Sequence, residues 1–526
     1  MAYDILIKGG SVIDGTGRAM ALADIGIADG KIAALGALSG RGAKTEIAAA
    51  GKYVTPGFID ITNHADTHLA LFVYPGQESM LLQGITTILG GNCGSSLAPL
   101  FSPESITAIS KWADVGEINI DWTGVGEFLS SVEKIRPGIN FGTFAGYGTL
   151  RRAVSGDEAR LLSLDERAQM NGFIRHAMHD GAFGLSLGLA YGHERISSTE
   201  ELIDAAHATA ASRGVLKMHL RSEGQEILGA VNEAVRIGRE TGVPIIISHF
   251  KIIGRTAWHN SQKALDLLSY AKSTGVDISF DVSPYRTTGS PLYLLLPAWA
   301  RVGGFKNMFR RIDNLQDRRK IIDGLRAATL HYENITIFSA RQKSTVGKTI
   351  AEIAETAGMG PEDALLETIR ANEGLVAIIG RTVSSKNTDE AIKNADAIVA
   401  SDGIGMSQDA QKTGNLAHPR SFGAFAHFWH RFVIDRPLLS PEDAIAKITS
   451  RPAQKIGIEG RGVIARGHHA DIAIFDPRLF RDRATYKNPF RYPAGMDYVV
   501  VNGQIAVSQG QYTGARSGHI LKKKIS

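Results

Sequence analysis

The stretch that decides the fold lies between residues 215 and 282, where short apolar runs alternate with amphipathic helical ones. It contains VLKMH at 215–219, EILGAVNEAVRIGRET at 226–241, PIIISH at 244–249, SQKALDLLSYAKS at 261–273 and VDISFDV at 276–282. Short apolar runs of this kind are typical of buried strands, and the longer stretches repeat apolar residues at helical spacing. Repeated strand-then-helix units predict a parallel β-sheet.

The same alternation extends outward on both sides. Strand-like runs at 84–89, 139–144 and 182–187 are also followed by helical stretches, so that the pattern occupies residues 56–455. Because there are so many units, we expect an α/β fold of the TIM-like (β/α)8 barrel type. The active site of such a barrel lies where the carboxyl ends of its strands meet.

The two chain ends have a different texture. Residues 1–55 hold short β-type segments separated by turn pairs such as Asp14-Gly15 and Asp29-Gly30, and residues 456–526 hold similar runs such as ADIAIFD at 470–476. Turn pairs of this kind connect antiparallel strands. We therefore predict a small β-sandwich domain formed by both ends.

The barrel pattern is interrupted at residues 285–338. This tract combines a segment rich in Leu, Pro and Trp with a basic helical segment from Phe305 to Arg326. A structureless loop of that length is uncommon in a compact domain. We predict an inserted lid or subdomain over the barrel mouth.

Composition excludes several classes of protein. The 526 residues are 44% hydrophobic and 21% charged, as in ordinary globular chains. Lysine and arginine exceed aspartate and glutamate by only 58 to 53, and the one dense basic run lies at 522–524, so no nucleic-acid partner is expected. The chain has neither a signal-peptide pattern nor an apolar stretch long enough for a bilayer, which predicts a cytoplasmic protein without a membrane partner. The sequence indicates no particular oligomeric state.

Three candidate metal ligands follow predicted strands. His219 and His249 each end a strand-like run, and Cys93, the only cysteine, follows Gly90-Gly91, where the backbone can turn. Barrel strands end on one rim, so these side chains can converge there. A thiolate and two imidazoles suit zinc, and three protein ligands leave a position for water. On pattern alone, the alternative that each histidine is a core or capping residue stays open.

A candidate general base occurs late in the barrel pattern. The run ADAIVA at 395–400 leads into Ser401-Asp402-Gly403. A carboxylate at this strand end could take a proton from the attacking water and return it to a leaving amine. An ordinary Asp-Gly turn is the alternative.

Several motifs together resemble a known family. The stretch TPGFIDITNHAD at 55–66, which follows the β-rich start, resembles the amidohydrolase superfamily. Further motifs resemble its D-aminoacylase (N-acyl-D-amino-acid deacylase) branch: GNCG at 91–94, HLRSE at 219–223, SHFK at 248–251, SDG at 401–403, HPR at 418–420, VNG at 501–503 and TGARSG at 513–518. The similarity runs in order over nearly the whole chain.

The resemblance implies a zinc-dependent hydrolase that converts N-acyl-D-amino acids into a D-amino acid and a carboxylate. It implies zinc ligands at Cys93, His219 and His249, an acid/base at Asp402, and substrate-carboxylate contacts from Lys251, Tyr285 and Arg420. A guanidinium offers a two-pronged clamp for a carboxylate, and a lysine adds a point charge. The expected partner is therefore a small molecule with a free carboxylate.

One departure from the superfamily pattern concerns a second metal. The His-x-His pair falls on Thr62-Asn63-His64, so only His64 matches as a metal residue. Threonine is a poor zinc ligand, and we expect a second metal to bind weakly or not at all. His68, four residues further on, could rescue a site.

Two alternatives to this function stay open. A related amidase or cyclic-amide hydrolase could share the scaffold, because fold and metal ligands do not fix the substrate. A catalytically silent homologue is the other alternative, since the first histidine of the pair is missing.

Overall fold

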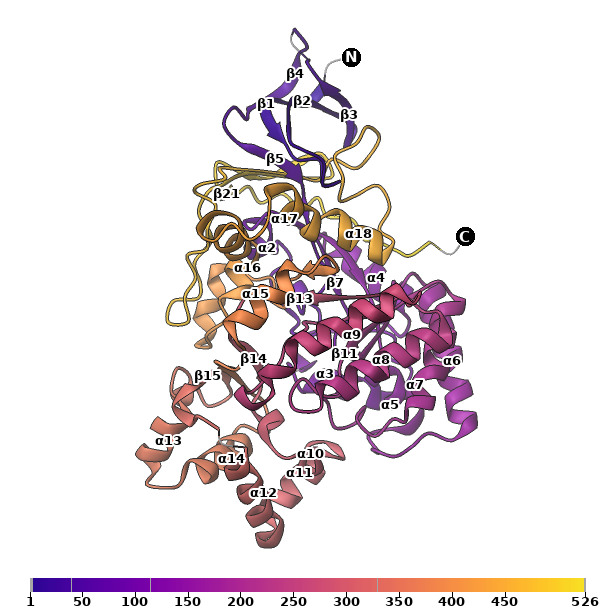
Figure 1. Ribbon diagram of the computed structural model, residues 1–526, viewed down its shortest axis with the longest axis vertical. Helices are drawn as coiled ribbons and strands as arrows, with labels where there is room; N and C mark the ends of the chain where they lie inside the picture. Colours follow the sequence, from indigo (N-terminus) through magenta and orange to yellow (C-terminus); the bar gives the residue numbers. More distant parts are fainter. Residues whose placement is uncertain (1–2, 39, 114, 329, 525–526) are drawn as a thin grey trace.

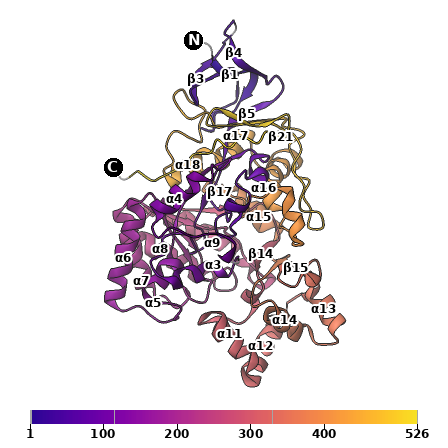
Figure 2. The same ribbon diagram turned by 180° about the vertical axis from the view of Figure 1, so that it is seen from behind.

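The computed structural model describes residues 3–38, 40–113, 115–328 and 330–524. Figures 1 and 2 show three parts along the longest axis: a β-sheet from both chain ends, the barrel in the middle, and an inserted subdomain at the opposite end. The predicted α/β barrel with a β-rich domain from both ends is confirmed. In the ranges described, no helix has the length and apolar character needed to cross a membrane.

Eight parallel strands form the barrel in the described part of the chain. They are β6 (Phe58–Asp60), β7 (Ile85–Gly90), β8 (Asn140–Thr143), β10 (Gly184–Gly188), β11 (Val215–His219), β12 (Ile245–Ile247), β13 (Ile278–Val282) and β17 (Ala397–Val399), with β9 (Ala145–Gly146) continuing β8. A parallel bridge between Asn63 and Gly403 joins the first and last strands. Both faces of these strands are covered, which is why their sequences are nearly continuous apolar runs.

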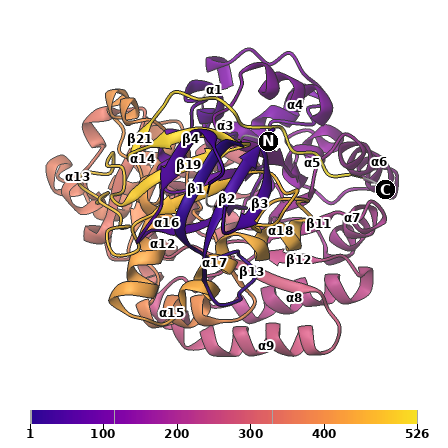
Figure 3. The same cartoon turned by 90° about the horizontal axis from the view of Figure 1, so that it is seen from above.

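Amphipathic helices surround the barrel (Figure 3). They are α4 (Val125–Lys134), α5 (Tyr147–Ser155), α6 (Leu164–His179), α7 (Thr199–Ala211), α8 (Ile227–Thr241), α9 (Ser261–Ser273), α15 (Ser385–Lys393), α16 (Arg420–Trp429) and α17 (Pro441–Ile448). Ser163 and Ser198 cap α6 and α7 by accepting hydrogen bonds from backbone N–H groups of the first turn. The helix α8 buries Ile227, Val231 and Ala234, spaced to lie along one face of the helix.

The interior of the barrel is a packed core rather than a channel. Phe144, Phe183 and Ile246 belong to one buried apolar cluster, which Ile456 of α18 (Ser450–Ile456) joins. Side chains that fill a barrel in this way leave the carboxyl ends of the strands as the place for a site.

Both chain ends build one nine-stranded sheet. Its strands are β1 (Tyr3–Val12), β2 (Ala21–Ala28), β3 (Lys31–Gly36), β4 (Ala43–Ala48), β5 (Tyr53–Pro56), β18 (Ile472–Phe475), β19 (Met496–Val501), β20 (Gln504–Ser508) and β21 (Gln511–Tyr512). The first part of β1 pairs with β4 and its end pairs with β5, so the sheet folds over a core of its own that includes Ile7 and Ile25. The last residues, which the sequence analysis assigned to this domain, instead pair with the barrel: Leu521 N–H donates to the Phe141 carbonyl at 2.7 Å.

The inserted subdomain is longer than the predicted range of 285–338. It contains β14 (Thr288–Pro291), α10 (Ala298–Arg301), α11 (Gly304–Asp313), α12 (Leu315–Ala327), β15 (Ile335–Ala340), α13 (Ile350–Ala357), α14 (Pro361–Ala371) and β16 (Val376–Gly380). Because β16 is the central strand between β14 and β15, the small sheet is complete only at Gly380. A separate core that includes Leu292, Ile337 and Ile378 holds the subdomain together.

Candidate metal centre and active site

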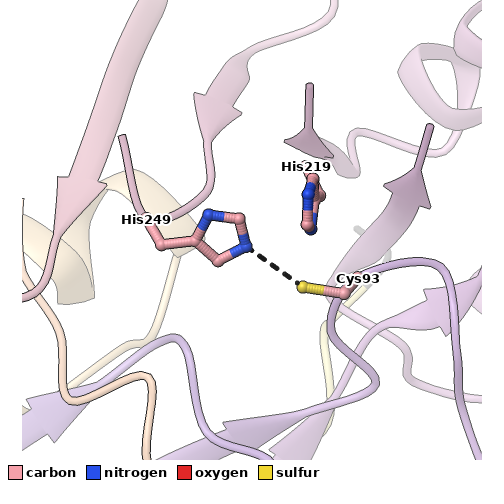
Figure 4. A group of neighbouring side chains, drawn as sticks. All are labelled: Cys93, His219 and His249. Carbon is pink, nitrogen blue, oxygen red and sulfur yellow. Dashed lines mark hydrogen bonds between the residues drawn. The ribbon is translucent and has the colours of Figure 1, made fainter. Parts of the chain in front are cut away.

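Cys93, His219 and His249 converge at the carboxyl ends of the barrel strands. His219 is the last residue of β11, His249 follows β12, and Cys93 follows β7. One potential ligand atom from each lies within 4.8 Å of the others, and all three residues are buried. Figure 4 shows a ring nitrogen of His249 facing the Cys93 sulfur, with the His219 ring beside them; Sγ and Nε2 are 3.3 Å apart.

The backbone at the site is held in a conformation that side-chain-bearing residues seldom adopt. Cys93 has a φ of 54°, His249 of 37° and Asp402 of 54°. Left-handed non-glycine residues cost free energy and concentrate at functional sites, because they aim side chains that a regular strand could not. Gly91 permits this turn, since a Cβ there would lie 2.0 Å from the Phe144 carbonyl oxygen.

The chemistry of the cluster fits zinc. Burial alone would raise the pKa of the Cys93 thiol, but His249, His219 and His64 together hold it well below its usual value. The thiolate is the form that binds metals. Nδ1 of His219 is buried without a hydrogen-bond partner among the described residues, as expected for an atom that coordinates a metal ion. Cysteine sulfur and histidine nitrogen are both zinc ligands, and three protein ligands are the number found in catalytic zinc sites.

Glu223 lies behind the two histidines. Its Oε1 is 3.0 Å from Nδ1 of His249, and its Oε2 is 3.8 Å from Nε2 of His219. Lys251 approaches the same Oε1 at 2.6 Å. Burial would raise the pKa of Glu223, but Lys251 and the two histidines lower it. A carboxylate in this position orients the histidines and makes them stronger ligands.

Asp402 lies between two cationic groups. Its Oδ1 is 3.2 Å from Nε2 of His64, and its Oδ2 accepts a hydrogen bond of 2.6 Å from Arg420. Burial would raise the pKa of Asp402, but Arg420 and His64 hold it well below its usual value. Burial conversely lowers the pKa of His64, yet Asp402 and Cys93 raise it to about 9.

The three predicted substrate contacts have different surroundings. Arg420 and Lys251 both line the cavity over the site. Tyr285 does not belong to that lining, because its ring stacks on His427 and its hydroxyl faces Asp482 at 3.5 Å. A contact from Tyr285 to the substrate stays a prediction, and the geometry does not favour it.

Sequence reasoning missed Glu223 and Lys217. Glu223 stands four residues after His219, and that spacing was the available signal. Lys217 is a charged residue inside an apolar strand, two positions before His219 and therefore on the same side of β11. Its side chain is fully buried in the barrel.

A large cavity covers the site. It has a volume of about 1860 Å³ and extends from Cys93 and His219 to Leu294, Ile335 and Val376 of the inserted subdomain. Lysine and arginine outnumber aspartate and glutamate along its lining, twelve to three. Such a lining attracts anionic ligands, since like charges concentrated in a cleft focus the field.

Comparison with known proteins identifies the family of the chain. Residues 45–507 match the Amidohydrolase family, and the chain belongs to that family. N-acyl-D-glutamate deacylase of Alcaligenes xylosoxydans xylosoxydans is 32% identical over 524 residues, which are 99% of this chain and 97% of that protein.

Solved structures of deacylases share the overall fold of the chain. N-acyl-D-glutamate deacylase from Bordetella bronchiseptica, complexed with zinc and a phosphonate that mimics the tetrahedral intermediate, superposes with a TM-score of 0.85 at 29% identity, over 99% of this chain and 100% of that chain. A D-aminoacylase described with a binuclear metal centre, in which one metal activates and a second attenuates, superposes with a TM-score of 0.84 at 29% identity and the same coverage.

Proposed function

We propose that the protein is a zinc-dependent hydrolase of the amide bond in N-acyl-D-amino acids. The observation that carries this is the convergence of Cys93, His219 and His249 beside Asp402, in a cavity that Arg420 also lines. The relatives at about this level of similarity, D-aminoacylase and N-acyl-D-glutamate deacylase, support the substrate class and its D configuration.

The metal contributes one part of the chemistry. Zinc, when bound by Cys93, His219 and His249, supplies Lewis-acid polarisation of a carbonyl and makes water a nucleophile at neutral pH. Glu223 and Lys251 keep His249 oriented, because both approach its Nδ1, the ring nitrogen on the side away from Cys93.

Asp402 moves the proton in this proposal. Its carboxylate takes a proton from the attacking water, the water oxygen bonds to the acyl carbon, and the C–N bond breaks. The same proton then passes to the leaving nitrogen, which gives a free amino group and a carboxylic acid. The acid loses the second proton of the former water to the amine or to solvent and becomes the carboxylate product. His64, at 3.2 Å from Asp402, keeps the carboxylate oriented.

Arg420 connects binding with proton transfer. Its guanidinium pairs with Asp402 at 2.6 Å, which weakens that carboxylate as a base. When the substrate carboxylate accepts hydrogen bonds from the same guanidinium, the positive charge of Arg420 is shared between two anions. The pKa of Asp402 then rises toward the range useful for accepting a proton. Lys251 supplies a further positive charge.

The proposed partner is thus a small molecule with a free carboxylate, in agreement with the cationic lining of the cavity. A cytoplasmic location stays a prediction from the sequence.

The direct test is hydrolysis by the zinc-loaded protein of paired N-acetyl-D- and N-acetyl-L-amino acids, with aliphatic and acidic side chains, beside a cyclic amide. We expect amine release from the D series. The Asp402→Asn protein, prepared in parallel, serves as the inactive control. Turnover of only the cyclic amide, or of the L series, would replace the proposed substrate class. No turnover of any compound by a zinc-loaded protein would favour the silent homologue.

A further inference from the structure

Lys217 places a fixed positive charge inside the barrel, below the metal ligands. Its side chain is completely buried, and its ammonium contacts Thr62 Oγ1, the Ile61 carbonyl oxygen at 3.0 Å and Asp281 Oδ2 at 2.9 Å. The ammonium donates hydrogen bonds to the Thr62 hydroxyl and the Ile61 carbonyl, and it forms an ion pair with the Asp281 carboxylate. The ammonium group is therefore anchored in one position.

A buried ammonium group such as that of Lys217 is costly and calls for a structural or functional explanation. Moving an ammonium from water into a protein interior costs several kcal/mol unless hydrogen bonds and an opposite charge compensate for it. Neighbouring barrel positions carry apolar side chains such as Phe144 and Ile246, which involve no such cost. Asp281 also accepts a hydrogen bond of 2.7 Å from the His249 backbone N–H, so the pair is joined to the loop that carries a zinc ligand.

The position of Lys217 bears on a second metal ion. A second ion beside Cys93 would draw on His64 and on residue 62, where the superfamily has the first histidine of its His-x-His pair. Here residue 62 is a threonine, and its hydroxyl is engaged by the lysine. The second site therefore lacks one of its two nitrogen ligands, and the Lys217 ammonium already binds the hydroxyl that stands in its place.

We propose that Lys217 excludes a second divalent cation from the space between His64, Cys93 and Asp402. The Lys217 ammonium holds the Thr62 hydroxyl, and Asp281 offsets part of its charge. Together with the Arg420 guanidinium on Asp402, the ammonium keeps this part of the site positive and repels an additional ion through a medium of low dielectric constant. The enzyme accordingly holds one zinc, and excess zinc does not attenuate it as a second metal attenuates the related D-aminoacylase. This inference rests on the proposed zinc site and not on the proposed substrate.

The test counts metal ions. Each protein is equilibrated with excess Zn²⁺, freed of unbound metal by gel filtration, and analysed by plasma mass spectrometry, with circular dichroism as the check on folding. We expect one zinc per chain in the unchanged protein and also in Thr62→His, because Lys217 still repels the second ion. Thr62→His combined with Lys217→Met and Asp281→Asn should hold two. That combination removes both charges of the pair, so no buried carboxylate is left unpaired.

A matched control uses another buried lysine. Lys447 contacts the carbonyl oxygens of Asn394, at 2.6 Å, and Ala397, away from the metal centre, and Thr62→His with Lys447→Met should keep one zinc. Two zinc ions in Thr62→His alone, or one in the folded triple variant, would overturn the proposal. If the triple variant does not fold, a Zn²⁺ titration of the unchanged protein and of Thr62→His decides, since saturation at two ions in either contradicts exclusion by Lys217. Failure of the proposed function would appear instead as absent hydrolysis with these zinc counts intact.

Discussion

The centre of the barrel has two unlike sides. The zinc side consists of Cys93, His219 and His249, with Glu223 behind the histidines. The lysine side consists of Thr62, Lys217 and Asp281. Both sides carry buried charge, but the first presents electron-pair donors to an open cavity, whereas the second satisfies its cation internally.

The difference shows how one barrel rim can bind a metal on one side and refuse it on the other. His219 and Lys217 are two residues apart on β11 and point to the same side of the strand. His219, at the strand end, reaches the cavity, whereas the Lys217 ammonium, one layer deeper, binds oxygen atoms of the protein. Position along the strand therefore decides whether a polar side chain serves a ligand or the fold.

The largest effect is expected from removing the sulfur of the zinc side. Cys93→Ala should lose nearly all zinc and nearly all hydrolytic activity, because two histidines alone make a weak site. Metal analysis and an activity assay measure both losses. His68→Ala is the control, since His68 lines the cavity beside His64 but is not in the ligand cluster. Full zinc retention in Cys93→Ala would remove the cysteine from the site.

Asp402 touches His64 and Arg420 rather than the zinc cluster, and its replacement separates catalysis from metal binding. Asp402→Asn should keep one zinc and lose about 10²- to 10⁴-fold in turnover, because the amide has nearly the same shape but cannot take the proton. Turnover is measured on protein of verified zinc content. Near-normal turnover would make Asp402 a structural turn residue and assign the proton transfer elsewhere.

Replacing Glu223 tests whether zinc binding depends on the negative charge of the carboxylate behind the histidines. Glu223→Gln should weaken zinc affinity by about 10- to 100-fold, since the buried carboxylate partner of His249 loses its charge. Competition with a chelator of known affinity measures the change. Glu333→Gln is the matched control, because Glu333 is exposed and also lines the cavity. Equal zinc affinity in the two variants would show that Glu223 does not support the zinc ligands and only pairs with Lys251.

The smallest effect is expected from replacing Arg420, and it concerns substrate binding. Arg420→Lys keeps the charge but not the two-pronged geometry, so KM for an N-acyl-D-amino acid should rise by about tenfold, close to the worth of one charge-assisted hydrogen bond. The comparison is an analogue whose carboxylate is converted to an amide. A similar change for both compounds would show that Arg420 acts on Asp402 or the fold and does not bind the substrate carboxylate.

Much of the site follows from strand ends that the sequence displays. His219 and His249 end apolar runs one strand-helix unit apart, and parallel strands end on one rim, so their convergence was predictable. Cys93 was predictable from the glycines before it. The contact between Arg420 and Asp402 was not, because both residues were assigned separate roles and only their distance of 2.6 Å joins them.

Other features escaped for physical reasons. Lys217 lies in a run that is otherwise apolar, and its partners Thr62 and Asp281 are far away in sequence, so nothing local indicates that its charge is compensated. The end of the inserted subdomain at Gly380 depends on which strand occupies the middle of its sheet. Pairing order of that kind is a long-range property that local patterns do not encode.

The sequence by itself predicted the barrel and the β-rich ends, since period and strand length respond to local burial. It placed Cys93, His219 and His249 at strand ends, and only the resemblance to the D-aminoacylase family implied that they bind zinc. Only the tertiary structure decided the electrostatics: that Glu223 supports His249, that Arg420 restrains Asp402, and that Lys217 fills the place beside Thr62. The reason is that an interaction between buried charges depends on separations of a few ångströms between residues that are distant along the chain.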